Sequence, residues 1–248
     1  MSTHVMVVAD RFTGFVHSDD VRTISGLTAE INKGVFDDGD GEVLLHEGQG
    51  VGSFERTYVQ QAIDRRKLTD RIRFTGPEVA PEGRDVVHKH SENNVLLAGL
   101  RQLDEARYAA DIRVHGDNEL LLDHQTGEHV QGMVIVEAVR QLFLGVFERG
   151  YRNRWPLSDF YIVWNSVNLT FGNFLFPLPA EIRCTVRELS VDKPDRQLDF
   201  ELDFELYQSG KLAASGQVGF SGFPRQKIAV LERRKAQKAL KGHLGASA

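Results

Sequence analysis

The chain has 248 residues, a formal net charge of −5 and 41% hydrophobic residues, as expected for a soluble globular protein of one large or two small domains. Its single cysteine, Cys184, excludes an intrachain disulfide, and the acidic balance argues against nucleic acid as the main ligand. No signal peptide or membrane span is recognisable, so we expect a cytoplasmic protein without a membrane partner.

The first 80 residues predict a small α/β layer of unknown role. Apolar runs at 4–10, 42–48 and 71–76 indicate strands, and residues 23–34 and 54–68 have helical patterns. The glycine-rich loop at 48–53 lacks the GxGxxG spacing of dinucleotide sites, and 80 residues are too few for a full dinucleotide fold. A nucleotide site is therefore not favoured here.

A segment rich in proline and glycine at 76–85 marks a domain boundary. Beyond it, strands are predicted at 93–100, 106–115, 159–172, 181–191, 196–208 and 211–223, with one long helix at 133–149. Strict alternation of apolar and acidic residues along 198–206 predicts a strand with one face buried. One apolar helix followed by an antiparallel meander predicts an α+β protein in which a curved sheet wraps the helix, which is the hotdog fold.

The long helix is apolar almost all round, yet it carries Glu137, Arg140 and Gln141. At 100° per residue, Arg140 and Gln141 lie about 60° and 40° to either side of Glu137. The three side chains therefore share one face. Burying such groups is costly unless they are paired or used, so this face predicts a cleft, although a purely structural ion pair between Glu137 and Arg140 would also satisfy the pattern.

The segment HVQGMVIVEAVRQ at 129–141 resembles the motif of the A-factor biosynthesis (AfsA-like) hotdog family. It matches at eight positions and departs at Gln131, where the family usually has proline. VVHKHSENNVLL at 86–97 resembles the opening signature of that family. The resemblance covers roughly residues 85–223. The helix is more distantly similar to that of hotdog β-hydroxyacyl-carrier-protein dehydratases, whose histidine precedes the glutamate by fourteen residues. Asp123 holds that position here.

The resemblance implies an acyltransferase that moves a β-ketoacyl group from an acyl-carrier-protein or CoA thioester to a small hydroxylated, phosphorylated acceptor, as in γ-butyrolactone synthesis. Family members usually carry two hotdog repeats and this chain has one, so we expect a homodimer to supply the other half. A dehydratase, a thioesterase and a non-catalytic acyl-binding module remain alternatives.

The chemistry of acyl transfer assigns roles to the motif residues. Backbone amides near Gly132 and Met133, at the helix N-terminus, would bind the thioester oxygen. Glu137 would take the hydroxyl proton if desolvation raises its pKa, with His129 and His124 as the other candidate bases.

The remaining predicted binding residues are charged or polar. Arg140 and Gln141 would bind the substrate, Arg140 through a phosphate or carboxylate. His88 and Lys89 follow the family pattern and would line the carrier entrance. The sequence contains no recognisable set of metal ligands, and no cofactor is predicted. Residues 224–248 contain seven Lys or Arg and one Glu, which predicts an exposed basic helix that could bind an acidic partner.

Overall fold

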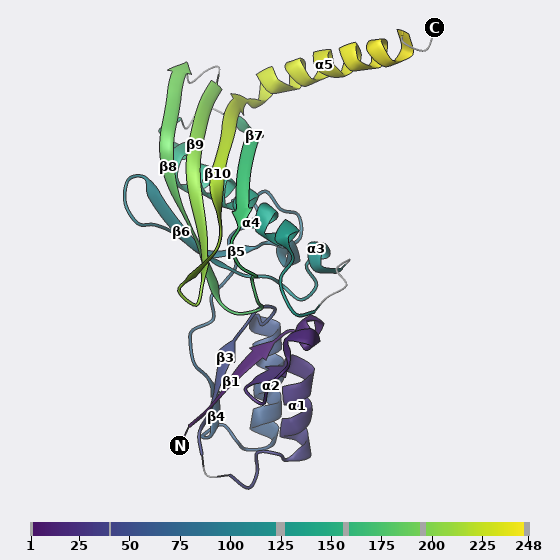
Figure 1. Ribbon diagram of the computed structural model, residues 1–248, viewed down its shortest axis with the longest axis vertical. Helices are drawn as coiled ribbons and strands as arrows, with labels where there is room; N and C mark the ends of the chain where they lie inside the picture. The colour runs from purple at the N-terminus through teal and green to yellow at the C-terminus, as the bar shows by residue number, and fades with distance from the viewer. Residues whose placement is uncertain (1, 40, 123–126, 156–158, 194–196, 246–248) are drawn as a thin grey trace.

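The computed structural model describes residues 2–39, 41–122, 127–155, 159–193 and 197–245. Two layers follow one another along the chain (Figure 1), a parallel α/β layer and then a larger antiparallel sheet wrapped around a helix. None of the described helices is long and apolar enough to cross a membrane.

The N-terminal layer is a four-stranded parallel sheet in the order β2-β1-β3-β4. Its elements are β1 (Thr3–Val8), the 3-10 turn η1 (Asp10–Phe15), β2 (Val21–Thr23), α1 (Ile24–Lys33), β3 (Val43–Glu47), α2 (Ser53–Arg65) and β4 (Ile72–Phe74). The predicted strands and helices are all present, and β2 is an additional strand. The two helices pack against each other beside the sheet (Figure 1).

Local sequence explains where α1 begins and ends. The Thr23 hydroxyl accepts a hydrogen bond from the Gly26 amide at 3.1 Å, which caps the first turn. Gly34 closes the helix with φ of 80°, a conformation that glycine adopts without steric cost.

The second layer is a six-stranded antiparallel sheet in the order β5-β6-β8-β9-β10-β7. Its strands are β5 (Leu97–Gln102), β6 (Arg107–Ile112), β7 (Phe160–Phe171), β8 (Ala180–Lys193), β9 (Gln197–Gln208) and β10 (Lys211–Pro224). The short turns η2 (Glu92–Asn94), α3 (Glu119–Leu122) and η4 (Arg152–Arg154) connect these elements. The six-stranded sheet and the helix α4 (Gly132–Val146) together form the predicted hotdog fold.

Helix α4 lies against the concave face of this sheet and is apolar because it is buried there. Strand β9 places its predicted apolar face on the core, where Leu198, Phe200, Leu202, Phe204 and Leu206 are all buried. Cys184 in β8 is buried as well, and burial raises the pKa of its thiol to about 12. The thiol is therefore protonated and unreactive at neutral pH.

The end of the long helix differs from the sequence prediction. The sequence predicts one helix at 133–149, but α4 passes at Val146 into a π-helical turn, η3 (Phe147–Tyr151). Gly150 allows the Tyr108 side chain to approach the backbone closely. A side chain at this position would place its Cβ 2.2 Å from the Tyr108 hydroxyl oxygen, so only glycine fits.

The two layers share one hydrophobic core, and a buried glutamine ties them together. The Gln49 side chain donates to the carbonyls of Ile112 and Leu178 at 3.1 and 2.9 Å and accepts from the Val114 amide at 2.7 Å. Gln49 follows β3, whereas its three partners belong to the hotdog layer, so the N-terminal layer is fixed on the hotdog domain by hydrogen bonds.

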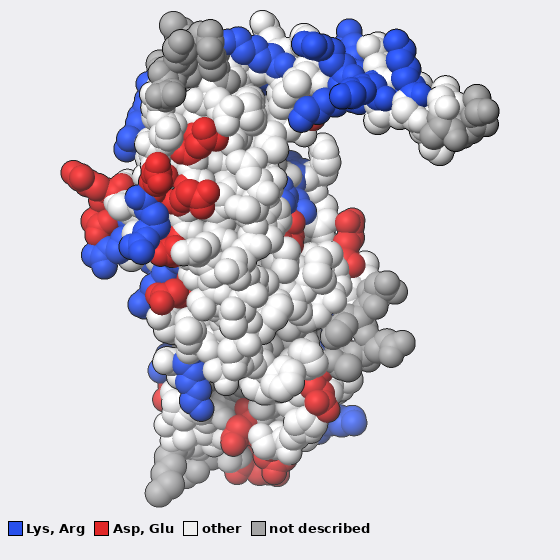
Figure 2. Space-filling view, turned by 45° about the horizontal axis from the view of Figure 1, so that its top comes forward, with Lys and Arg blue, Asp and Glu red and all other residues white. Residues whose placement is uncertain are grey.

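The C-terminal helix α5 (Arg225–Gly245) projects away from the body (Figure 1). Ile228 is its one buried residue among those described. Lys and Arg side chains gather along this helix (Figure 2). The predicted exposed basic helix is therefore present.

Candidate functional site

The polar face of α4 is organised around the Glu137 carboxylate. Its Oε2 accepts from Arg140 Nε at 2.8 Å, and its Oε1 accepts from the second Arg140 nitrogen at 2.9 Å. Gln141 Nε2 donates to Oε1 at 3.0 Å, and Lys89 Nζ lies 2.7 Å from the same oxygen. Glu137 thus binds two cations and one amide.

These contacts decide the charge state of Glu137. Burial raises the pKa of its carboxyl, but hydrogen bonds from Arg140, Lys89 and Gln141 lower it, and the net pKa lies below the ordinary value of 4.5. The condition under which Glu137 was expected to act as a base, a net pKa raised by desolvation, is therefore not met. Glu137 is a carboxylate at neutral pH and a weak base, well suited to hold Lys89 and Arg140 in place.

Gln141 connects this face to the residues that directly precede β5. It is fully buried, its Oε1 accepts from the Leu96 amide at 2.8 Å, and its Nε2 also donates to the Asn94 carbonyl at 2.8 Å. All of its polar atoms are engaged within the protein. Gln141 therefore supports the carboxylate from behind and is not placed to bind the substrate as expected from the motif.

A basic pocket of about 660 Å³ opens beside this network. Lys89 and Arg140 line it, and both were predicted to bind substrate. Its charged lining comprises five Lys or Arg (Arg84, Lys89, Arg140, Arg152, Arg225) and three carboxylates (Asp85, Glu148, Asp159). The aromatic residues Phe160, Tyr161 and Trp164 of β7 form another part of the wall. This basic pocket favours an anionic ligand.

His88 faces the basic pocket and pairs with a carboxylate that sequence reasoning missed. Its Nε2 lies 3.0 Å from Glu148 Oε1, and Arg152 donates to the same carboxylate at 2.8 Å. Burial raises the pKa of Glu148, but hydrogen bonds from His88 and Arg152 hold it below 4.5. His88 also has φ of 52°, a left-handed conformation that is uncommon outside glycine and occurs at functional sites.

The spacing of Glu148 could have identified it. It lies eleven residues after Glu137, which returns it to within about 20° of the same helix face. Its place in the last turn of the predicted helix does not by itself indicate a buried position.

A second, mostly apolar pocket of about 300 Å³ adjoins the network on the side of Met133 and Val136. Lys89 and Trp164 line both pockets, and Glu137 lines the apolar one. The Glu137 network therefore stands between a basic pocket and an apolar pocket, as a site for an acyl chain and a polar acceptor would require.

His129 and Gly132 line neither the basic pocket nor the apolar pocket. They line a third pocket, of about 480 Å³, with Phe171 and Phe174. The His129 ring packs on Phe174 with centroids 5.1 Å apart. The Gly132 and Met133 amides donate to no described residue, as expected for the first turn of a helix. The structure does not bring His129 to Glu137 in one chain, and His124 lies outside the described residues.

Two solved structures are similar to part of this chain. The chain resembles a mutant thioesterase from Pseudomonas aeruginosa, with 14% identity, a TM-score of 0.39 and coverage of 52% of this chain and 81% of that one. It also resembles a dehydratase heterocomplex from Xenorhabdus doucetiae, with 16% identity, a TM-score of 0.45 and coverage of 57% and 91%. A search of curated proteins found no match.

The family comparison covers the layer that holds all three of these pockets. The model of the A-factor biosynthesis hotdog domain matches residues 74–224, more than half of the chain. That range begins at the end of β4 and closes at the last residue of β10, so it includes α4 and its polar face. The chain belongs to the A-factor biosynthesis hotdog family.

Proposed function

We propose that this acyl-thioester enzyme transfers an acyl group from a carrier thioester to a small, anionic, hydroxylated acceptor. The family and its fold support thioester chemistry. One observation carries the choice of acceptor, namely that Glu137 holds Lys89 and Arg140 at the wall of a pocket with five cationic side chains. A phosphorylated acceptor matches that charge.

In the proposed reaction the acceptor hydroxyl oxygen attacks the thioester carbonyl carbon. His88, held by Glu148, takes the hydroxyl proton. The tetrahedral oxyanion is stabilised by hydrogen-bond donors, and its collapse breaks the carbon–sulfur bond. The thiolate leaves and recovers the proton from His88. The acyl chain occupies the apolar pocket beside Met133 and Val136.

Mass spectrometry with an acyl-carrier thioester tests the reaction class. We expect an ester of the acyl group with dihydroxyacetone phosphate, together with the free carrier thiol, and far less transfer to unphosphorylated dihydroxyacetone. Loss of water would identify a dehydratase instead, the free acid would identify a thioesterase, and unchanged substrate would identify a binding module. Any of these three results would reject transfer.

We further propose a homodimer paired through β7. This strand is an edge of the sheet, it is long, and Val167 and Phe171 are 48% and 53% exposed. Long apolar edges are normally covered. Antiparallel pairing of two β7 strands about a two-fold axis would set the Phe171 end of one strand beside the Phe160 end of the other. The pocket of His129 and Gly132 would then adjoin the basic pocket of the partner.

The substitution Val167→Asp tests this pairing. It places a charge in the centre of the proposed seam, where like charges related by the two-fold axis repel each other. We expect the dimer to dissociate at least tenfold more readily in analytical ultracentrifugation. Val35→Asp is the matched control, because Val35 is 62% exposed in the N-terminal layer. A parent protein that is monomeric at micromolar concentration would contradict the proposal.

The basic helix α5 is proposed to bind the acidic carrier. Its first residue, Arg225, also lines the basic pocket, so a carrier on α5 would sit beside the site. We expect replacement of Arg233, Arg234, Lys235 and Lys238 by glutamine to raise KM for carrier-bound substrate about tenfold. Small thioester analogues should be unaffected, and added salt should mimic the change. Equal loss with both substrates would refute the carrier role.

A further inference from the structure

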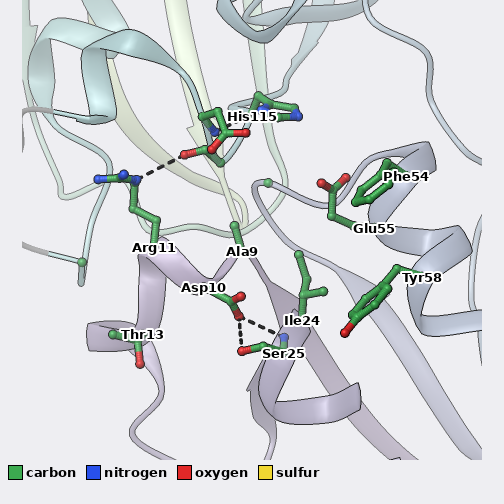
Figure 3. Close-up of a pocket in the computed structure, with 14 residues that line it drawn as sticks. Ala9, Asp10, Arg11, Thr13, Ile24, Ser25, Phe54, Glu55, Tyr58 and His115 are labelled. Atoms are coloured by element: carbon green, nitrogen blue, oxygen red, sulfur yellow. Dashed lines mark hydrogen bonds between the residues drawn. The ribbon is translucent and has the colours of Figure 1, made fainter. Parts of the chain in front are cut away.

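Outside the hotdog site, a pocket of about 790 Å³ lies between the two layers. Residues that follow β1 and residues that follow β3 both line it (Figure 3). In the strand order β2-β1-β3-β4, the chain leaves β1 toward β2 and leaves β3 toward β4, in opposite directions. This is a topological switch point, where open α/β sheets bind ligands. Its volume is that of a small-molecule site.

The glycine-rich loop after β3 packs the layers together and does not cradle phosphate. A Cβ on Gly48 would lie 2.4 Å from the Pro177 carbonyl oxygen, and one on Gly50 would lie 2.3 Å from the Ala9 Cβ. These glycines are required by close approach between the chain's own atoms. The pocket above them is therefore defined by the side chains at its walls.

The charge of those walls disfavours anions. Three carboxylates, Asp10, Glu55 and Asp117, line the pocket, and Arg11 is the one Lys or Arg among its described lining residues. Arg11 is occupied, since its Nε and one terminal nitrogen donate to the carbonyls of Gly116 and Leu121 at 3.2 and 3.3 Å. A phosphate group would be repelled here.

The same walls offer hydrogen-bond acceptors and flat surfaces. Asp10 uses Oδ1 to accept from the Ser25 amide and hydroxyl at 3.0 and 2.8 Å, and Glu55 uses Oε2 to accept from the Gly52 amide at 3.0 Å. Each carboxylate has a second oxygen that can accept a ligand hydroxyl. On the α2 side stand the rings of Phe54 and Tyr58, 76% and 44% exposed and one helical turn apart (Figure 3).

From this combination we infer a second ligand site, for a nucleoside without phosphate groups. The base stacks on Phe54 or Tyr58, and the ribose hydroxyls donate to Asp10 and Glu55. The His115 Nδ1 accepts from the Asp117 amide at 3.0 Å, so in the neutral ring Nε2 carries the hydrogen and can donate. This site is independent of the thioester chemistry proposed for the hotdog layer.

Calorimetric titration of the full-length protein tests the inference, with adenosine, guanosine, cytidine and uridine as probes and the matching 5′-monophosphates as comparisons. We expect at least one nucleoside to bind saturably and its monophosphate to bind at least tenfold more weakly. Asp117→Asn should reduce the difference in affinity between the nucleoside and its monophosphate, because it removes one negative charge that repels the phosphate group.

The variants Phe54→Ala and Tyr58→Ala identify the site. Both side chains are exposed, so folding should persist, and one or both changes should weaken nucleoside binding about tenfold. Thr57→Ala is the control, since Thr57 lies on the same helix and does not line the pocket. No saturable binding by any nucleoside, equal binding of the monophosphate, or binding that survives both aromatic changes would overturn the inference.

Discussion

The substitution Glu137→Gln is expected to lower the free energy of unfolding by about 1–3 kcal/mol and turnover with an anionic acceptor by ~10²-fold. The change leaves Lys89 and Arg140 without their shared carboxylate and directs an amide toward donors. Breaking a fully buried pair costs about 3–5 kcal/mol. The side chains here are 17–27% exposed, so solvent screening reduces that figure.

The effect of Glu137→Gln depends on pH in a defined direction. Because the pKa of Glu137 is lower in the folded protein than the ordinary 4.5, its contribution is complete above about pH 4.5. It is lost as the pH falls through the folded pKa. Urea denaturation of both proteins should therefore give curves that differ at pH 7 and converge on acidification.

Glu119→Gln is the matched control for this experiment. Glu119 is exposed and lines the same apolar pocket, and a surface change of this kind alters stability by about 0.5 kcal/mol or less. A Glu137→Gln protein with unchanged stability would mean that the carboxylate makes no net contribution to folding, and one with higher stability would mean that it opposes folding, as expected of a base with a raised pKa. Either result would contradict the supporting role given to Glu137.

The predictable part of the fold is the part that rests on local periodicity. Helix α4 and strand β9 follow from apolar spacings of 3.6 and 2 residues, which need no knowledge of partners. Strand β2 was missed because Val21–Thr23 is too short to show alternation. It exists through its parallel pairing with β1, a contact that single-sequence patterns do not contain.

Several residues of the candidate site were predictable from the sequence, but Glu148 and the contacts between the site residues were not. The family motif pointed to Lys89 and Glu137, and helix geometry placed Arg140 beside Glu137. The ion pair between Lys89 and Glu137 joins residues 48 positions apart in the sequence, which spacing alone cannot indicate. The same limit explains why His129 was grouped with Glu137, although the fold places them in different pockets.

The substitution His88→Asn is expected to lower turnover ~10²–10⁴-fold, the usual range for loss of a general base, while leaving the melting temperature within about 2 °C of the parent value. Asparagine is chosen because it tolerates the left-handed conformation that His88 adopts. The His88 side chain is 37% exposed, so its removal leaves no cavity. The loss should appear in kcat, because His88 acts on the proton and not on the affinity for the carrier.

Two further variants show whether the histidine acts through its carboxylate partner. Glu148→Gln keeps the shape of the side chain but removes the charge that orients the His88 ring, so we expect a smaller loss, ~10–10²-fold. His90→Asn repeats the substitution two residues away in the same pocket. His90 pairs with no carboxylate among the residues that the structure describes, and we expect the turnover of the His90→Asn protein to change by less than about threefold.

The pattern across the three variants decides the assignment. We expect turnover to fall strongly in His88→Asn, to an intermediate degree in Glu148→Gln and little in His90→Asn. This pattern would support a histidine base that is held by a carboxylate. If His88→Asn turns over within threefold of the parent, the proton goes elsewhere. In the proposed dimer the basic pocket adjoins the partner's His129, so His129→Asn then becomes the decisive variant. Mixing it with Glu137→Gln protein should restore activity in heterodimers, since each heterodimer keeps one complete site built from both chains.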